Sequence, residues 1–182
     1  MDTKILAVGL AMGLVVAVAL GRAEASKIPW SGTFSGSGIS TNIDTNRDGS
    51  KAGWDTDVIN SNLGRFSSQD VGEVLPPPSA PVTCPQGNLE FPYLLISVVS
   101  THEETGDQLF SELVSGTFCF DTATGAFSFS FVLSVTGGTG QFAGATGSLE
   151  ATATGVDVVV GPKGQFFSHS TGEFTGTIIT PD

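Results

Sequence analysis

The sequence predicts an all-β protein that folds as a single eight-stranded antiparallel β-barrel with long loops in its N-terminal half. Two observations predict this class. Beyond residue 25, no window has apolar residues at the helical spacing i, i+3, i+4 and i+7 without interruption by Gly or β-branched residues. Alternation of apolar and polar residues recurs instead, in segments separated by Gly, Asp, Asn and Pro. An antiparallel sandwich is the alternative.

The clearest expected strand covers residues 126–136. Its alternate positions place five apolar side chains on one face and mainly Ser and Thr on the other. We expect the apolar face to line the barrel interior; it consists of Phe127, Phe129, Phe131, Leu133 and Val135. The other seven expected strands are residues 30–40, 63–74, 91–101, 108–114, 116–121, 147–160 and 165–180.

Two long loops are expected in the first half of the chain. Residues 41–62 are polar and rich in Asp and Asn. Residues 75–88 contain five prolines, which exclude a central strand because proline lacks the backbone N–H that a sheet requires.

The first residues have the pattern of a signal peptide. Lys4 precedes an apolar run over residues 5–20, and Ala23-Glu24-Ala25 supplies a small-x-small cleavage site. We expect a signal peptide at 1–25, a single barrel domain at 26–182, and a secreted, periplasmic or extracellular location. An uncleaved membrane anchor is the alternative, although the run is shorter than the roughly 20 residues of a comfortable span.

The net charge of −11 restricts the partners of the chain. An acidic protein is repelled by phosphate backbones and by anionic lipid headgroups. We therefore expect no nucleic-acid partner and, after signal cleavage, no membrane partner.

The two cysteines, Cys84 and Cys119, are expected to form one disulfide, because a lone pair in an exported protein usually does. A catalytic thiol is a weaker alternative, since neither cysteine has a histidine nearby in the sequence. A metal site is weaker still, since two cysteines would need two further ligands.

Residues 44–55 fit the calcium-loop pattern D-x-N-x-D-G-x5-D. The expected ligands are four side chains and one backbone carbonyl, that of Ser50, and they come from Asp44, Asn46, Asp48, Ser50 and Asp55. The alternative is a solvated cluster of Asp and Asn turns, because neither flank is helical. We expect any calcium to be structural, and no other cofactor.

Residues 135–147, VTGGTGQFAGATG, contain the Gly-x-Gly-x-x-Ala spacing of a dinucleotide-binding turn. Such a turn requires a following helix to hold the pyrophosphate, and the next residues favour a strand. We therefore interpret the stretch as a corner between two strands, with Phe142 folded under it as a plug for the barrel end.

The pattern GGTGxFxxAxG at residues 137–147 resembles the signature of the plant dirigent proteins and, more loosely, that of the allene oxide cyclases. The resemblance implies an eight-stranded barrel, often assembled as a trimer. It also implies an apolar cavity that steers a reactive small molecule, without a cofactor, toward one coupling or ring closure. It assigns no catalytic residue to this chain.

Three functions remain open at this point. The first is a secreted, cofactor-free barrel that binds a small apolar ligand. The second is an extracellular structural or self-assembling protein, which a barrel completely filled by phenylalanine would favour. The third is an isomerase or cyclase, which ionisable residues in an open cavity would favour. His102 and His169 are expected to be solvated rather than catalytic.

Overall fold

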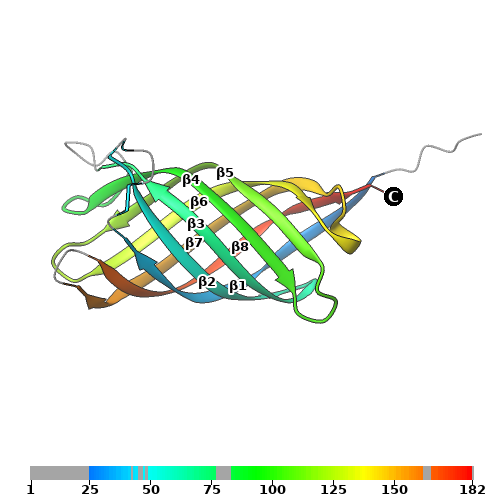
Figure 1. Ribbon diagram of the computed structural model, residues 1–182, viewed down its shortest axis with the longest axis horizontal. Helices are drawn as coiled ribbons and strands as arrows, with labels where there is room; N and C mark the ends of the chain where they lie inside the picture. Colours follow the sequence, from blue (N-terminus) through cyan, green and yellow to red (C-terminus); the bar gives the residue numbers. More distant parts are fainter. Residues whose placement is uncertain are drawn as a thin grey trace, which may run out of the picture.

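The computed structural model describes residues 25–41, 43–44, 47, 49–76, 83–161 and 165–181. These residues form one closed antiparallel β-barrel whose strands follow one another around the barrel in sequence order, with β8 returning to pair with β1 (Figure 1). The strands are β1 (Ser26–Ser40), β2 (Lys51–Ser61), β3 (Gly64–Val74), β4 (Leu89–His102), β5 (Gln108–Phe120), β6 (Ala126–Gly138), β7 (Thr146–Val160) and β8 (Phe166–Thr180). The predicted fold class is confirmed.

Helical structure in the described residues is limited to the single 3-10 turn Gly140–Phe142 between β6 and β7. None of the described helical residues belongs to a helix long and apolar enough to cross a membrane. The glycine-rich stretch is therefore a corner between two strands and does not lead into a helix of the kind that binds a dinucleotide.

Two expectations about the strands were wrong. One error missed a strand and the other divided one strand into two, so the expected number of eight strands was still correct. The expected loop 41–62 contains β2, which pairs with β1 and with β3. The segments expected as separate strands, 108–114 and 116–121, form the single strand β5. A register shift between Leu113 and Ser115 places Val114 outward, 64% exposed, so the alternation is interrupted while the strand continues. The described parts of the expected loop 75–88, residues 75–76 and 83–88, contain no strand.

The inner face of β6 is the aromatic face expected from the sequence. Phe127, Leu133 and Val135 are buried, and Phe129 and Phe131 are partly buried against the core. The facing positions on β7 carry small residues, since Phe131 lies opposite Ala151 and Phe129 opposite Ala153.

One end of the barrel, at the right in Figure 1, is closed by packed side chains. The Phe66 ring is fully buried, and its centroid lies 5.4 Å from that of Trp30 and 6.1 Å from that of Phe142 on the 3-10 turn. Leu109 and Ile178 are also buried there. Together these residues seal this end of the interior.

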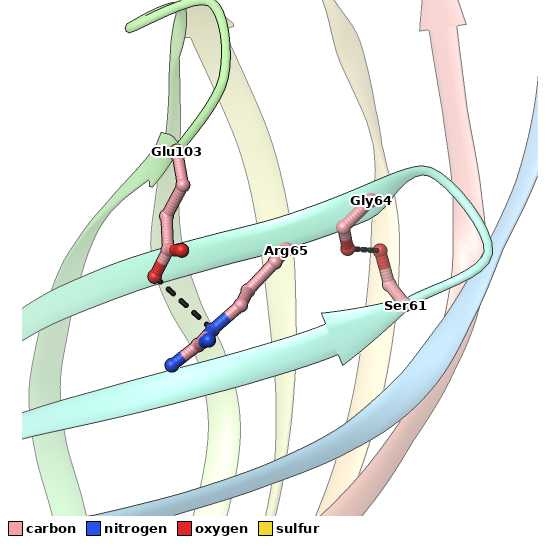
Figure 2. Close-up of polar contacts among 4 residues, drawn as sticks. All are labelled: Ser61, Gly64, Arg65 and Glu103. Atoms are coloured by element: carbon pink, nitrogen blue, oxygen red, sulfur yellow. Dashed lines mark hydrogen bonds and ion pairs between the residues drawn. The ribbon is translucent and has the colours of Figure 1, made fainter.

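The turns around the closed end are tied by local polar contacts (Figure 2). The Ser61 hydroxyl donates to the Gly64 carbonyl over 2.8 Å, and Arg65 Nε lies 3.2 Å from Glu103 Oε1. The Arg65–Glu103 ion pair is solvent-exposed, so its net contribution to stability is below about 1 kcal/mol.

His102 is buried at this end and is not the solvated residue expected from the sequence. Its Nε2 lies 3.1 Å from the Leu63 carbonyl oxygen, and its Nδ1 lies 3.2 Å from the Thr105 hydroxyl. Both ring nitrogens therefore have partners, and the ring packs edge-on against Phe66. His169, on the outer face of β8, is exposed as expected.

The opposite end carries the predicted disulfide, which is confirmed. Cys84 and Cys119 are bonded, with their Cα atoms 5.5 Å apart. Glu90 fixes the same segment, since its Oε2 accepts hydrogen bonds from the backbone N–H groups of Thr83 and Cys84 over 2.8 and 3.2 Å. The segment before β4 is thus attached to the barrel wall covalently and by hydrogen bonds.

Candidate ligand cavity

The barrel interior is not filled at the end opposite the plug. A cavity of about 290 Å³ lies there and extends to the barrel end where Thr41, Lys51 and Phe166 are found. This is the left end in Figure 1. One wall of the cavity is aromatic and the other is acidic, and the two walls come from different strands.

The aromatic wall is centred on β6 and its neighbour β5. The rings of Phe127, Phe129 and Phe131 follow one another along β6 with nearly parallel planes, and the Phe118 ring centroid lies 5.2 Å from that of Phe127. The phenylalanines that line the cavity are Phe34, Phe91, Phe118, Phe127, Phe129, Phe131, Phe166 and Phe174.

The acidic wall is formed by β2 and β3. Asp55 and Asp57 occupy alternate positions of β2 and share its inner face with the buried Ile59. Asp70 lies directly opposite Asp55 in the β2–β3 register and also lines the cavity. The pairing of the two strands therefore brings three carboxyl groups into one region of the interior.

Glycines on β1 make room for two of these carboxyl groups. Gly36 pairs with Asp57, and Gly38 pairs with Asp55. A Cβ atom at Gly36 would overlap Asp57 Oδ1, and one at Gly38 would overlap Asp55 Oδ1. The glycines of β1 therefore provide the space that the two aspartates of β2 occupy.

Hydroxyl groups border the acidic wall. Ser68 and Ser100 are buried on β3 and β4, with their Oγ atoms 3.4 Å apart. Tyr93, Ser111 and Ser168 line the cavity as well. The polar part of the lining thus combines carboxyl and hydroxyl groups, with Lys51 at the mouth.

Burial is the main cause that makes these carboxyl groups hard to ionise. It raises the pKa of Asp55 to about 6, and burial together with the Asp55 charge raises the pKa of Asp57 to about 6. Burial, with repulsion from Asp55 and Asp57, raises the pKa of Asp70 to about 9. Among the described residues, no Lys, Arg or His forms an ion pair with any of the three.

The cavity also affects Tyr93. Burial, followed by the charges of Asp55 and Asp70, raises the pKa of the Tyr93 phenol well above its ordinary value. Its hydroxyl is therefore neutral throughout the physiological pH range and able to donate a hydrogen bond.

The expected calcium-loop residues lie in different surroundings. Asp44 accepts hydrogen bonds from the backbone N–H groups of Arg47 and Gly49, and the Ser50 hydroxyl is buried 3.3 Å from Glu73 Oε2. Asp55 lies in β2 and faces the cavity.

Asn46 and Asp48 are outside the described residues, so calcium binding by this loop stays a prediction. Within the described ranges, no group of three or more His, Cys, Asp or Glu is arranged to hold a metal ion.

Asp57, Asp70 and Tyr93 line the cavity although the sequence had not indicated them as site residues. A usable signal was present, because Asp55, Asp57 and Ile59 alternate as the inner face of a strand does. Phe66, Ser68 and Asp70 alternate in the same way on β3, although two of these three inner residues are polar.

Replacement of Asp70 by asparagine is expected to make stability less dependent on pH. The pKa of Asp70 is higher in the folded state than in the unfolded state, so the folded protein binds more protons and loses stability as pH rises from about 4 to about 9. Because each unit of pKa shift corresponds to about 1.4 kcal/mol, we expect Asp70→Asn to raise the free energy of unfolding at pH 8 by about 2 kcal/mol or more.

Urea denaturation at pH 4 and pH 8 tests this expectation. The two proteins should differ little at pH 4, where Asp70 is protonated in the folded state. Glu104→Gln is the matched control, because it removes one carboxylate from an exposed turn. A Glu104→Gln effect at pH 8 as large as that of Asp70→Asn would assign the gain to net charge and contradict the burial explanation.

Comparison with models of known protein families, with curated proteins and with solved structures finds no match to this chain.

Proposed function

We propose that this protein is a secreted, cofactor-free β-barrel that binds a small apolar molecule in its open-end cavity. The observation that carries the proposal is the cavity itself, with its aromatic wall. Its volume of about 290 Å³ is near the lower limit of ordinary ligand sites. An apolar cavity of about 150 Å³ binds benzene, so this one has room for a molecule of one or two rings.

The same observation argues against a purely structural role for the interior. A structural barrel is expected to be filled, as the closed end is by Trp30, Phe66 and Phe142. The phenylalanines of β6 leave space instead, because small residues lie opposite them. The Cys84–Cys119 disulfide is compatible with the oxidising compartment of a secreted protein.

A cofactor-free isomerase or cyclase is the second candidate, and the acidic wall favours it. At neutral pH the raised pKa of Asp70 keeps its carboxyl group protonated and able to donate a proton, whereas the pKa values of Asp55 and Asp57 leave their carboxylates largely ionised as acceptors. The eight-stranded barrel and the GGTGxFxxAxG corner support a relationship to the allene oxide cyclase and dirigent barrels. Trimeric assembly and a structural calcium ion belong to the same proposal.

Binding of the neutral two-ring fluorescent probe 6-propionyl-2-(dimethylamino)naphthalene tests the ligand proposal. We expect the folded protein to increase the probe's emission at micromolar concentrations, with one site per chain. Ser170→Phe places a ring in the cavity and should weaken binding at least about tenfold, a loss of about 1.4 kcal/mol.

Thr171→Phe is the matched control, since Thr171 is the next residue of β8 and is exposed on its outer face. It should bind the probe as the wild type does. If the wild type gives no enhancement, or if both variants bind equally well, the cavity is not a ligand site.

The catalytic candidate is tested separately with a reactive precursor whose spontaneous ring closure gives a racemic product. The wild-type protein should yield one enantiomer in excess. Asp70→Asn should bind the neutral probe normally and return a racemic product. Equal enantiomeric excess from both proteins would remove Asp70 from the proposed chemistry.

A further inference from the structure

We propose that the molecule bound in this cavity is a small organic ammonium ion, with its charged nitrogen among Asp55, Asp57 and Asp70 and its apolar part against the phenylalanines of β6. This inference rests on the proposed function, because it names the chemical class of the ligand for the same cavity.

The first argument is the placement of uncompensated acidic groups. Asp55 and Asp70 face each other across β2 and β3, and Asp57 is two positions from Asp55 on the same inner face. A carboxylate inside the barrel that has no opposite charge beside it is costly. The described residues form no ion pair with these three carboxyl groups, so a cation entering the cavity would supply the missing opposite charge.

Apart from Lys51 at the mouth, the groups packed around the acidic wall are uncharged. On β1 the facing residues are Gly36 and Gly38, and on β4 the nearest titratable group is the neutral Tyr93 phenol. Beyond them, β8 contributes Ser168 and Ser170. Lys51, also on β2, lies at the mouth. A ligand cation would therefore meet carboxyl and hydroxyl oxygens on this wall, all of which accept hydrogen bonds or attract positive charge.

The second argument is independent of the carboxyl groups and comes from the aromatic wall. The faces of aromatic rings attract cations, and most strongly where water is excluded. Phe127, Phe129 and Phe131 line the same cavity as the carboxyl groups, and each ring is nearly parallel to the next. A site for a purely neutral apolar ligand requires the aromatic wall alone, whereas an organic ammonium ion uses both walls.

Glycines on β1 leave space for the acidic wall. The space above Gly36 and Gly38 is occupied by the Asp57 and Asp55 carboxyl groups, so any side chain on these β1 positions would displace them. The strongly negative net charge of the protein favours the approach of a cation to the open end.

The size of the cavity favours an organic cation over a metal ion. The cavity, at about 290 Å³, is far larger than a metal ion, and most of its lining is apolar. A metal ion would need several oxygen ligands converging on one point. A bulky ammonium ion requires only that its charge lie near the carboxyl groups while its carbon atoms contact the rings.

A pair of ligands with the same shape and different charge tests the inference. Benzyltrimethylammonium and neopentylbenzene differ mainly by a quaternary nitrogen in place of a carbon atom. We expect the wild-type protein at pH 8 and moderate ionic strength to bind the ammonium compound about tenfold or more tightly than neopentylbenzene, each measured by displacement of 6-propionyl-2-(dimethylamino)naphthalene. This comparison needs no variant, so it does not depend on the folding of a mutant.

Variants then show which carboxyl groups cause the preference for the charged ligand. Asp55→Asn and Asp57→Asn should each reduce the affinity for benzyltrimethylammonium several-fold and leave that for neopentylbenzene unchanged, because these two carboxyl groups are ionised at pH 8. Glu150→Gln is the control, because Glu150 lies exposed on the outer face of β7. It should change neither affinity.

Each outcome decides a different point. If the probe and neopentylbenzene bind but the ammonium compound has no advantage, the ammonium inference is overturned and the proposed ligand site stands. If neither the probe nor either compound binds, the ligand-binding function itself is wrong. If millimolar calcium displaces benzyltrimethylammonium more strongly than sodium chloride of equal ionic strength, the acidic wall is a metal site and the inference fails.

Discussion

Replacement of Phe66 by alanine is expected to destabilise the protein by about 3–5 kcal/mol, the range observed when a fully buried aromatic side chain is removed. The Phe66 ring is 0% exposed and lies at the centre of the closed end. Its neighbours, Trp30, His102 and Phe142, belong to three different segments, so its removal leaves a void that no single side chain can fill. Urea denaturation measures the loss.

Phe167→Ala is the control for this experiment, since it removes the same atoms from a ring that is 42% exposed on the outer face of β8. We expect it to cost less than about 1 kcal/mol. Should Phe66→Ala prove too unstable to purify, Phe66→Leu retains part of the volume and should show a smaller loss in the same direction. Equal losses from Phe66→Ala and Phe167→Ala would show that the closed end is not the main source of stability.

Loss of the Cys84–Cys119 disulfide is expected to lower the free energy of unfolding by about 3–4 kcal/mol. The two cysteines are separated by 35 positions in the sequence, and the bond limits the conformations of the unfolded chain over that length. The double variant Cys84→Ser/Cys119→Ser should therefore unfold at a markedly lower urea concentration. The barrel strands should remain, because β4 and β5 still pair with each other.

A reducing agent provides the control for the disulfide. Dithiothreitol should destabilise the wild-type protein to the level of the double variant, and it should leave the stability of the double variant unchanged. If reduction and substitution both leave the urea midpoint where it is in the oxidised wild type, the disulfide does not contribute to stability.

The sequence predicted the architecture because most strands follow simple rules. The alternation in β6 is nearly perfect, and the glycine-rich stretch after it could only be a turn, since β-favouring residues follow. The disulfide could be predicted from cysteine number and the signal-peptide pattern alone. These features depend on local sequence, so neighbouring strands were not needed to find them.

The site was not predicted because its strands carry carboxyl groups where the inner face of a strand is usually apolar. On β2, two inner positions carry Asp55 and Asp57, and the preceding sequence is rich in Asp, Asn and Gly, so the segment has the composition of a loop. Their inward orientation becomes clear only with Gly36 and Gly38 of β1 opposite them, and that pairing is a property of the folded barrel. Because polar side chains face the cavity, the sequence of β2 indicated a loop, and neither the strand nor the position of its carboxyl groups in a cavity was predicted.

The strand order has a consequence for how the chain reaches its folded state. Every strand pairs with its neighbour in the sequence except at one seam, where β1 meets β8. The seven hairpin pairings each close a connection of at most 14 residues, whereas the seam must wait for the last strand. Until then β1 and β8 are free edges, which in other proteins promote aggregation. The β1 sequence SGTFSGSGIS, with three glycines and few large apolar side chains, is poorly suited to such edge-to-edge contacts.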